Sequence, residues 1–276
     1  MAEFLVLDSV THLTDADRGR AALCASHGGL YAGYHAAKMG VGALILNDAG
    51  IGLDSAGIAG VKLLDDLGTP AAAMGNRTAR IGDGADGLAR GRLTYVNPTA
   101  EQLGVEIGQT CREAMAILGR SELIPSPPPA PLDEARFEVE EAGAGGVRVF
   151  VMDSISLIRP EDVGHVVVSA SHGGLLGGRP ETAAKYAASA LVYSDADRGM
   201  EDAGVSRLPA LDARGIAAAC VSVFSARIGD GRSVYQKGII SVVNKAAELR
   251  GGHVGQSCRD FVTAMVDAAV RENNAA

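Results

Sequence analysis

The chain has 276 residues, which is long enough to bury a sizeable core. With 47% hydrophobic and 21% charged residues, it has the composition of a folded globular protein. A net charge of −8, with no basic stretch interleaved with aromatic residues, excludes a general binder of nucleic acids or anionic membranes. No apolar run approaches the roughly 20 residues needed to span a bilayer.

Short apolar runs alternate with helical patterns along the first half of the chain. The start of the sequence lacks the basic pattern of a leader peptide and predicts a first strand instead. Predicted strands are 4–7, 21–25, 43–46 and 70–74, with helices at 31–39 and 56–67. The second helix ends at Gly68, a favourable C-cap position. This alternation predicts a mainly parallel sheet with helices packed on it.

The second half predicts the same order of elements: strand, strand, helix, strand, helix, strand. Its predicted strands are 147–152, 165–170, 189–193 and 216–224. They are richer in β-branched residues than those of the first half, which strengthens the strand prediction.

Matching segments recur in both halves. "ASHGG" occupies 25–29 and again 170–174, an offset of 145, and "ARIGDG" occupies 79–84 and 226–231, an offset of 147. "GQTCR" at 108–112 likewise matches "GQSCR" at 255–259. Matches in this order, with one two-residue insertion, indicate a tandem duplication.

We therefore expect repeats over 1–120 and 147–276, joined by a proline-rich linker over 121–146. The expected fold is α/β: two doubly wound, mainly parallel-sheet units, similar to Rossmann or flavodoxin units, with pseudo-two-fold symmetry.

Polar residues follow the predicted strands in both repeats, at carboxyl ends where open α/β sheets bind ligands. The candidate catalytic residues are Asp8, Ser26, His27 and Asp48, with Asp153, Ser171, His172 and Asp195 in the second repeat. The candidate substrate-binding residues are Gly28, Gly29, Asn47, Arg80 and Asp83, with Gly173, Gly174, Ser194, Arg198, Arg227 and Asp230.

These residues are consistent with several kinds of function. The first is a hydrolase of amides, lactams or esters, or a lyase, for a small polar and anionic substrate. In that enzyme His27, oriented by Asp48, is the general base and the Gly28–Gly29 amides are oxyanion donors. A serine nucleophile is less favoured, because Ser26 and His27 point to opposite faces of a strand and no G-x-S-x-G pattern is present.

A divalent metal held by His27, Asp48 and Asp8 is a second possibility, without a compact ligand motif to support it. A non-catalytic sensor of a small anion is a third. In the structural alternative, the Gly-Gly pair only makes the turn and Arg80 only ties its loop to Asp83.

The order of strand, His-Gly, helix and strand resembles the caspase-like peptidases, in which the next strand ends in a nucleophilic cysteine. Here Asn47 and Ser194 stand at that place, so peptidase activity is not expected. Cys111 and Cys258 follow Thr110 and Ser257, which are predicted N-caps with an acidic residue three positions on. A thiol at a helix start can have a lowered pKa, although buried structural use is favoured for these two.

We expect no nucleotide cofactor, since no such motif is present, and either no cofactor or a divalent metal. The expected partners are a small-molecule substrate and further copies of the chain in a homo-oligomer. The default compartment is a reducing cytoplasm.

Overall fold

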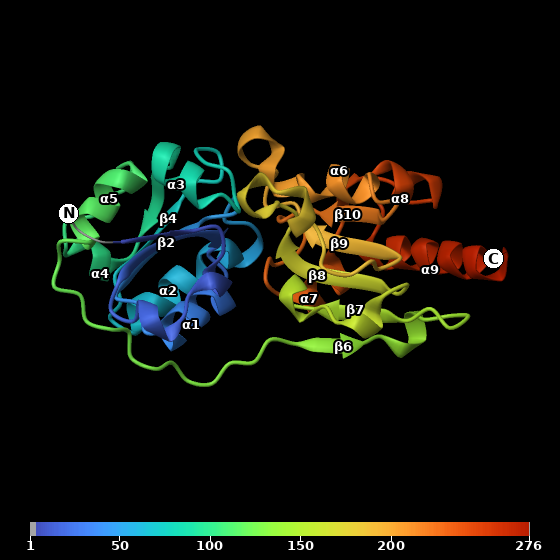
Figure 1. Ribbon diagram of the computed structural model, residues 1–276, viewed down its shortest axis with the longest axis horizontal. Helices are drawn as coiled ribbons and strands as arrows, with labels where there is room; N and C mark the ends of the chain where they lie inside the picture. Colours follow the sequence, from blue (N-terminus) through green and yellow to red (C-terminus); the bar gives the residue numbers. More distant parts are fainter. Residues whose placement is uncertain (1–3, 276) are drawn as a thin grey trace. The chain divides into compact units, whose positions relative to one another are not determined.

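The computed structural model describes residues 4–275 and contains two β-sheets, each with helices packed around it (Figure 1). One compact unit comprises Met1–Asp133 with Leu175–Gly178 and Asp197–Gly204, and the other comprises the remaining residues. Residues 1–3, part of the expected first repeat, lie outside the described range. Within residues 4–275, no helix is both long and apolar enough to cross a membrane.

The first sheet has five strands in sequential order. They are β1 (Leu5–Leu7), β2 (Ala21–His27), β3 (Ala43–Asn47), β4 (Ala71–Met74) and β5 (Leu93–Val96). Strands β1 to β4 are parallel, and β5 is antiparallel to β4. The order has no reversal, so it differs from the doubly wound order expected from the sequence, in which a reversal creates the binding crevice.

Helices cover both faces of this sheet. On one face α1 (Leu30–Lys38) and α2 (Ala59–Asp66) pack against alternate strand residues such as Cys24 and Leu44. On the other face α3 (Gly84–Arg90) and α5 (Cys111–Leu118) pack against Leu23 and Ile45, together with the short α4 (Pro98–Glu101). Burial on both faces explains why these strands appear as continuous apolar runs rather than alternating patterns.

The second sheet has six strands. They are β6 (Arg136–Glu138), β7 (Val149–Met152), β8 (Val166–His172), β9 (Ala190–Ser194), β10 (Ala217–Val221) and β11 (Ile240–Val243). The four central strands are parallel and both edge strands are antiparallel. The α/β class predicted from the sequence is confirmed, with mixed sheets. Strand β6 lies inside the range expected to be linker.

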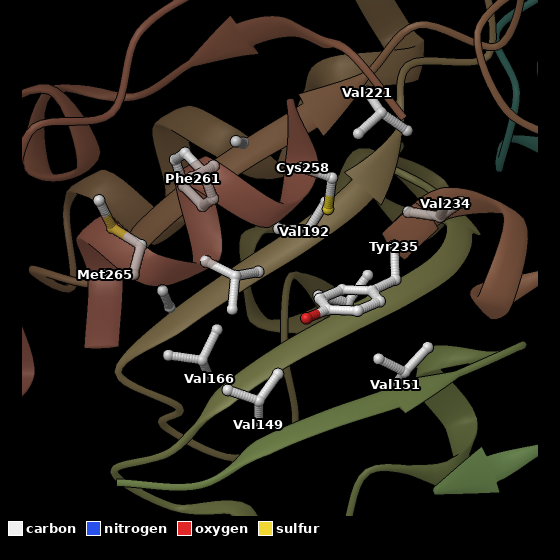
Figure 2. Packing of buried hydrophobic residues seen from close by; sticks show 14 of the residues in the cluster. Val149, Val151, Val166, Val192, Val221, Val234, Tyr235, Cys258, Phe261 and Met265 are labelled. Carbon is white, nitrogen blue, oxygen red and sulfur yellow. The ribbon is translucent and has the colours of Figure 1, made fainter. Parts of the chain in front are cut away.

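The core of the second unit lies between its sheet and two helices, α7 (Gly231–Lys237) and α9 (Cys258–Ala275). Figure 2 shows Tyr235, Phe261 and Met265 packed against the valines of the central strands. Helices α6 (Arg207–Asp212) and α8 (Lys245–Leu249) complete the unit.

The helix expected between the second and third strands of the second repeat does not form, so that prediction is wrong. Only single 3-10 turns occur there, at Leu176–Gly178 and Pro180–Thr182. Gly177 and Gly178 adopt left-handed φ values of 58° and 67°, which interrupt a right-handed helix. The buried Arg207 side chain donates to the carbonyls of Gly174, Thr182 and Ala183 in this segment at 2.6–2.9 Å.

Glycines allow the backbones of α1 and α2 to approach closely. A Cβ atom on Gly33 would lie 2.5 Å from Gly60 Cα and 2.7 Å from its carbonyl carbon. We predict that Gly33→Ala lowers the free energy of unfolding by about 3 kcal/mol, because two backbones must separate. Gly68→Ala is the control: its φ is +66° but its Cβ meets nothing within 4 Å, so it should cost only about 1 kcal/mol. Urea unfolding measures both, and equal losses would contradict the prediction.

Candidate functional site

His27 and Asn47 are neighbours at the carboxyl ends of β2 and β3. They are register partners, and Asn47 is in turn the partner of Met74 on β4. The register of β2 and β3 shifts between Leu23 and His27, and after this irregularity His27 pairs with Asn47. Register partners in parallel strands project to the same side of the sheet. His172 and Ser194 are the corresponding partners on β8 and β9.

The His27 ring is held in one tautomer. Its Nδ1 accepts a hydrogen bond from the Gly29 N–H at 3.1 Å, which assigns the proton of the neutral ring to Nε2. Burial lowers the pKa of His27 from 6.5 to about 4, so the ring is neutral at pH 7. His172 accepts from Gly174 N–H in the same way, also at 3.1 Å.

The Gly-Gly amides do not form an oxyanion hole, contrary to the sequence prediction. Gly29 N–H is used by His27, and Gly28 N–H donates to the Asn47 carbonyl at 2.7 Å. The second repeat is the same: Gly174 N–H donates to His172 and Gly173 N–H to the Ser194 carbonyl. Backbone donors already paired within the chain are not directed at a ligand.

The two glycines are instead explained by close packing. A Cβ on Gly28 would lie 2.5 Å from the Gly57 carbonyl oxygen, and one on Gly29 would lie 2.6 Å from His27 Nδ1. The turn therefore requires glycine at both positions, and it is the residues of this turn that orient the imidazole.

The Ser26 hydroxyl has a structural role. Its buried hydroxyl accepts from Val10 N–H at 2.9 Å and is oriented to donate to Ser9 Oγ at 3.4 Å. In the second unit Ser171 accepts from Ile155 N–H at 3.0 Å. These bonds tie the segment after β1 to β2 and the segment after β7 to β8, and they do not support a serine nucleophile.

The Asp48 carboxylate holds the backbone in place and does not orient His27. Its buried carboxylate accepts from Gly50 N–H and Asn76 N–H at 2.9 Å each and from the Thr94 hydroxyl at 2.7 Å. Among the described residues its partners do not include His27, so the predicted His27–Asp48 pair is wrong. Asp195 likewise accepts from Val223 N–H at 2.9 Å.

A left-handed turn follows Asp48. Ala49, Gly50, Ile51 and Gly52 have φ values of 48°, 75°, 65° and 68°, and residues 196–199 repeat the pattern at 47° to 68°. Left-handed conformation costs roughly 1–2 kcal/mol for each residue other than glycine. Side-chain acceptors offset this cost, because Asn47 Oδ1 accepts from Ala49 N–H and Asp48 from Gly50 N–H.

Asp8 and Asp83 both lie at the start of α3. Asp8 accepts from Gly84 N–H at 3.0 Å, and Asp83, the N-cap, accepts from Asp86 N–H at 2.9 Å. Asp153 and Asp230 do the same at α7, accepting from Gly231 and Ser233 N–H at 2.8 Å each. Helix capping thus accounts for four of the candidate carboxylates.

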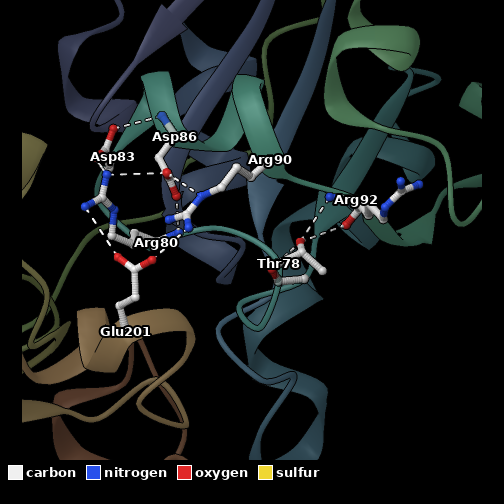
Figure 3. Close-up of polar contacts among 8 residues, drawn as sticks. Thr78, Arg80, Asp83, Asp86, Arg90, Arg92 and Glu201 are labelled. Atoms are coloured by element: carbon white, nitrogen blue, oxygen red, sulfur yellow. Dashed lines mark hydrogen bonds and ion pairs between the residues drawn. The ribbon is translucent and has the colours of Figure 1, made fainter.

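Arg80 belongs to an ion-pair network in the first unit (Figure 3). Its guanidinium contacts Asp83 at 2.9 Å and Asp86 at 3.4 Å. Asp86 also accepts from Arg90 Nε at 2.7 Å, and Arg90 donates to Glu201 at 2.7 Å. Burial by itself would raise the pKa of Asp86. Hydrogen bonds from Arg90 and from the Arg80 backbone, together with the charges of both guanidinium groups, have a larger effect and lower the pKa.

The second unit lacks this network. Ser233 stands where the first unit has Asp86, and its hydroxyl accepts from Arg227 N–H at 3.0 Å. Arg227 also lies 3.6 Å from Asp230. Arg198, a candidate substrate ligand, forms a two-bond ion pair with Asp202 at 2.7 and 2.8 Å.

Asn47 carries a buried donor without a partner. The residue is fully buried, and while Oδ1 accepts from Ala49 N–H, Nδ2 has no hydrogen-bond acceptor among the described residues. An unpaired buried N–H group costs about 1–3 kcal/mol. Such a group beside His27 is a candidate ligand contact.

Neither a metal cluster nor an activated thiol is found. Within residues 4–275, no group of three or more His, Cys, Asp or Glu side chains is arranged to hold a metal ion. The predicted capping box Thr110–Glu113 is confirmed, but burial raises the pKa of Cys111 and Cys258 to about 12 each. The buried structural use favoured from the sequence is therefore confirmed for both cysteines, and the alternative of a lowered thiol pKa is not.

Comparison with protein-family models, curated sequences and solved structures gives no match for this chain.

Sequence reasoning missed several residues of this region. Asp86 and Arg90 have the spacing of a helical ion pair and could have been found from that spacing. Glu201, Asn76 and Thr94 reach the site from distant segments, and no local pattern indicates them. Of the predicted set, His27 and Asn47 remain the candidate ligand contacts.

Acid should weaken the fold through His27. The pKa of His27 is lower in the folded protein than in the unfolded chain. Its contribution to the free energy of unfolding is therefore complete above about pH 6.5 and is lost as the pH falls towards 4, by up to about 3 kcal/mol. His27→Asn offers Oδ1 to Gly29 N–H without a titrating ring. We predict that the free energy of unfolding falls less steeply between pH 6.5 and 4 in this variant than in the wild type. Identical slopes in urea titrations would contradict this.

Asp86 should carry most of the stability of the network in Figure 3. Its side chain is 7% exposed, whereas that of Glu201 is 53% exposed. Asp86→Asn should lower the free energy of unfolding by about 2 kcal/mol, because two guanidinium groups lose a buried counter-charge. Glu201→Gln, the exposed control, should cost less than about 1 kcal/mol. Thermal and urea unfolding measure the difference, and an equal loss in both variants would refute it.

Proposed function

We propose that this protein is a small-molecule enzyme, a hydrolase or lyase. Its substrate is small and polar and carries a carbonyl or carboxylate group, which binds at the carboxyl ends of β2 and β3. The observation that carries the proposal is the His27 ring, whose Nδ1 is occupied by Gly29 N–H and whose pKa is lowered to about 4. Perturbed titratable groups of this kind are typical of functional sites.

In this proposal His27 is a hydrogen-bond donor, not the general base expected from the sequence. A neutral imidazole with its proton on Nε2 can polarise a carbonyl group and stabilise negative charge that develops on the oxygen. The Gly29 bond keeps the ring in that tautomer throughout the reaction. Because Asp48 is committed to Gly50, Asn76 and Thr94, it adds no base to the ring.

The hydrogen-bonding groups around His27 favour an oxygen ligand over a cation. Asp48 and Asp83 use their carboxylates on backbone N–H groups and arginines, whereas the amide of Asn47 keeps an unpaired donor. A ligand that accepts hydrogen bonds matches this set better than a cation does.

We further propose that the two units are copies of one ancestral α/β unit. Repeated side-chain bonds support this, such as those of the matched Asn97 and Asn244. Each accepts two backbone N–H groups at 2.8–3.0 Å and donates to a backbone carbonyl at 2.8–2.9 Å.

Turnover of a panel of amides, lactams, esters and hydroxy acids tests the function. His27→Ala should lower kcat/KM for the active compound about 100-fold or more, because the donor to the substrate oxygen is lost. His253→Ala, at an exposed position, is the control and should leave turnover unchanged. Full activity in His27→Ala would overturn the proposed role, and binding of panel compounds without turnover in the wild type would identify a binding protein instead.

A further inference from the structure

We propose that Asn47 Nδ2 is a second donor to the ligand oxygen contacted by His27, and that of the two His-Gly-Gly turns only the first forms a ligand site. This inference rests on the proposed function for the location of the ligand. It adds a specificity-determining residue and assigns the ligand atom as a carboxylate or carbonyl oxygen.

The second unit shows what the turn itself requires at this position. Ser194 occupies the equivalent place, and its hydroxyl accepts from Ala196 N–H at 3.4 Å, as Asn47 Oδ1 accepts from Ala49 N–H at 2.9 Å. A left-handed turn follows both residues, at 49–52 and at 196–199. A serine is therefore sufficient to hold the turn, and the Nδ2 group of Asn47 is not needed for it.

That extra group is costly where it lies. Asn47 is fully buried, and none of residues 4–275 provides Nδ2 with an acceptor to compensate for its burial. Register places it on the same face as His27, one strand away. An oxygen atom bound beside the imidazole would give Nδ2 the acceptor that it lacks among residues 4–275, and two donors converging on one oxygen is the usual arrangement for polarising a carbonyl.

The second turn is built differently. Arg207 donates its N–H to the Gly173 carbonyl and its Nε–H to the Gly174 carbonyl, at 2.8 and 2.9 Å. In the first unit the Gly28 carbonyl accepts from Gly60 N–H at 2.8 Å, and the Gly29 carbonyl accepts from backbone N–H groups of α1 instead of an arginine side chain. His172 is 5% exposed, whereas His27 is only partly buried. Ser194 offers a hydroxyl in place of a side-chain amide, so the second turn lacks the access of the first turn and the amide N–H of Asn47.

Imidazole NMR signals provide a direct test, with acetate and acetamide as the probes. Either probe should shift the His27 signals and leave those of His172 unchanged, and comparing the two separates a carboxylate from a neutral carbonyl ligand. Asn47→Ser keeps an acceptor for Ala49 N–H and should weaken the dissociation constant about tenfold through loss of one donor. Ser194→Asn is the matched control and should bind as the wild type does.

Several results would overturn the inference: equal shifts at both histidines, no His27 shift with either probe, or unchanged binding in Asn47→Ser. A purely structural Asn47 would lower Tm in that variant without changing probe affinity. Should Asn47→Ser fail to fold, Asn47→Asp keeps Oδ1, removes the N–H donor and should abolish acetate binding.

Turnover separates the two proposals. Weakened probe binding in Asn47→Ser, in a protein without turnover of any panel compound, would leave this inference standing while the enzymatic function fails. Turnover with an unchanged KM in Asn47→Ser would reject the inference alone.

Discussion

The Asp48 carboxylate is the interaction on which the rest of the candidate site depends. It lies directly after β3 and binds the backbone of the turn that follows, the backbone beyond β4 and the hydroxyl of Thr94 on β5. One buried acceptor thus joins three segments and offsets the strain of left-handed residues that include the β-branched Ile51. Asn47, the last residue of β3, is held in place by the same turn.

Strand-end carboxylates have a common role in both units. Asp8, after β1, accepts the first N–H of α3, and Asp153, after β7, accepts the first N–H of α7. Each carboxylate therefore fixes a strand end and a helix start to each other. Carboxylates at the ends of strands resemble catalytic acids in a sequence. Here most are anchors, and the functional candidates are neutral donors, the imidazole of His27 and the amide of Asn47.

The features that depend on local sequence could be predicted. The strands at 21–27 and 43–47, helix α1 and the Thr110 capping box all follow from hydrophobic runs or cap residues. Strand order could not be predicted, because it depends on which edges pair. The edge strands β5 and β11 were missed because they are only four residues long and Thr94 and Ser241 interrupt their apolar runs. The lost helix after His172 depends on Arg207, which lies 35 positions further along the chain.

The cysteines have a consequence for chemical labelling. Cys24 and Cys111 lie in the core of the first unit, Cys220 and Cys258 in that of the second, and all four are reduced cysteines with no exposed surface. A thiol reagent reacts with the thiolate, so none of the four is modified while its unit stays closed. Each unit therefore carries its own pair of internal reporters, and the order in which the pairs become modified records which unit opens first.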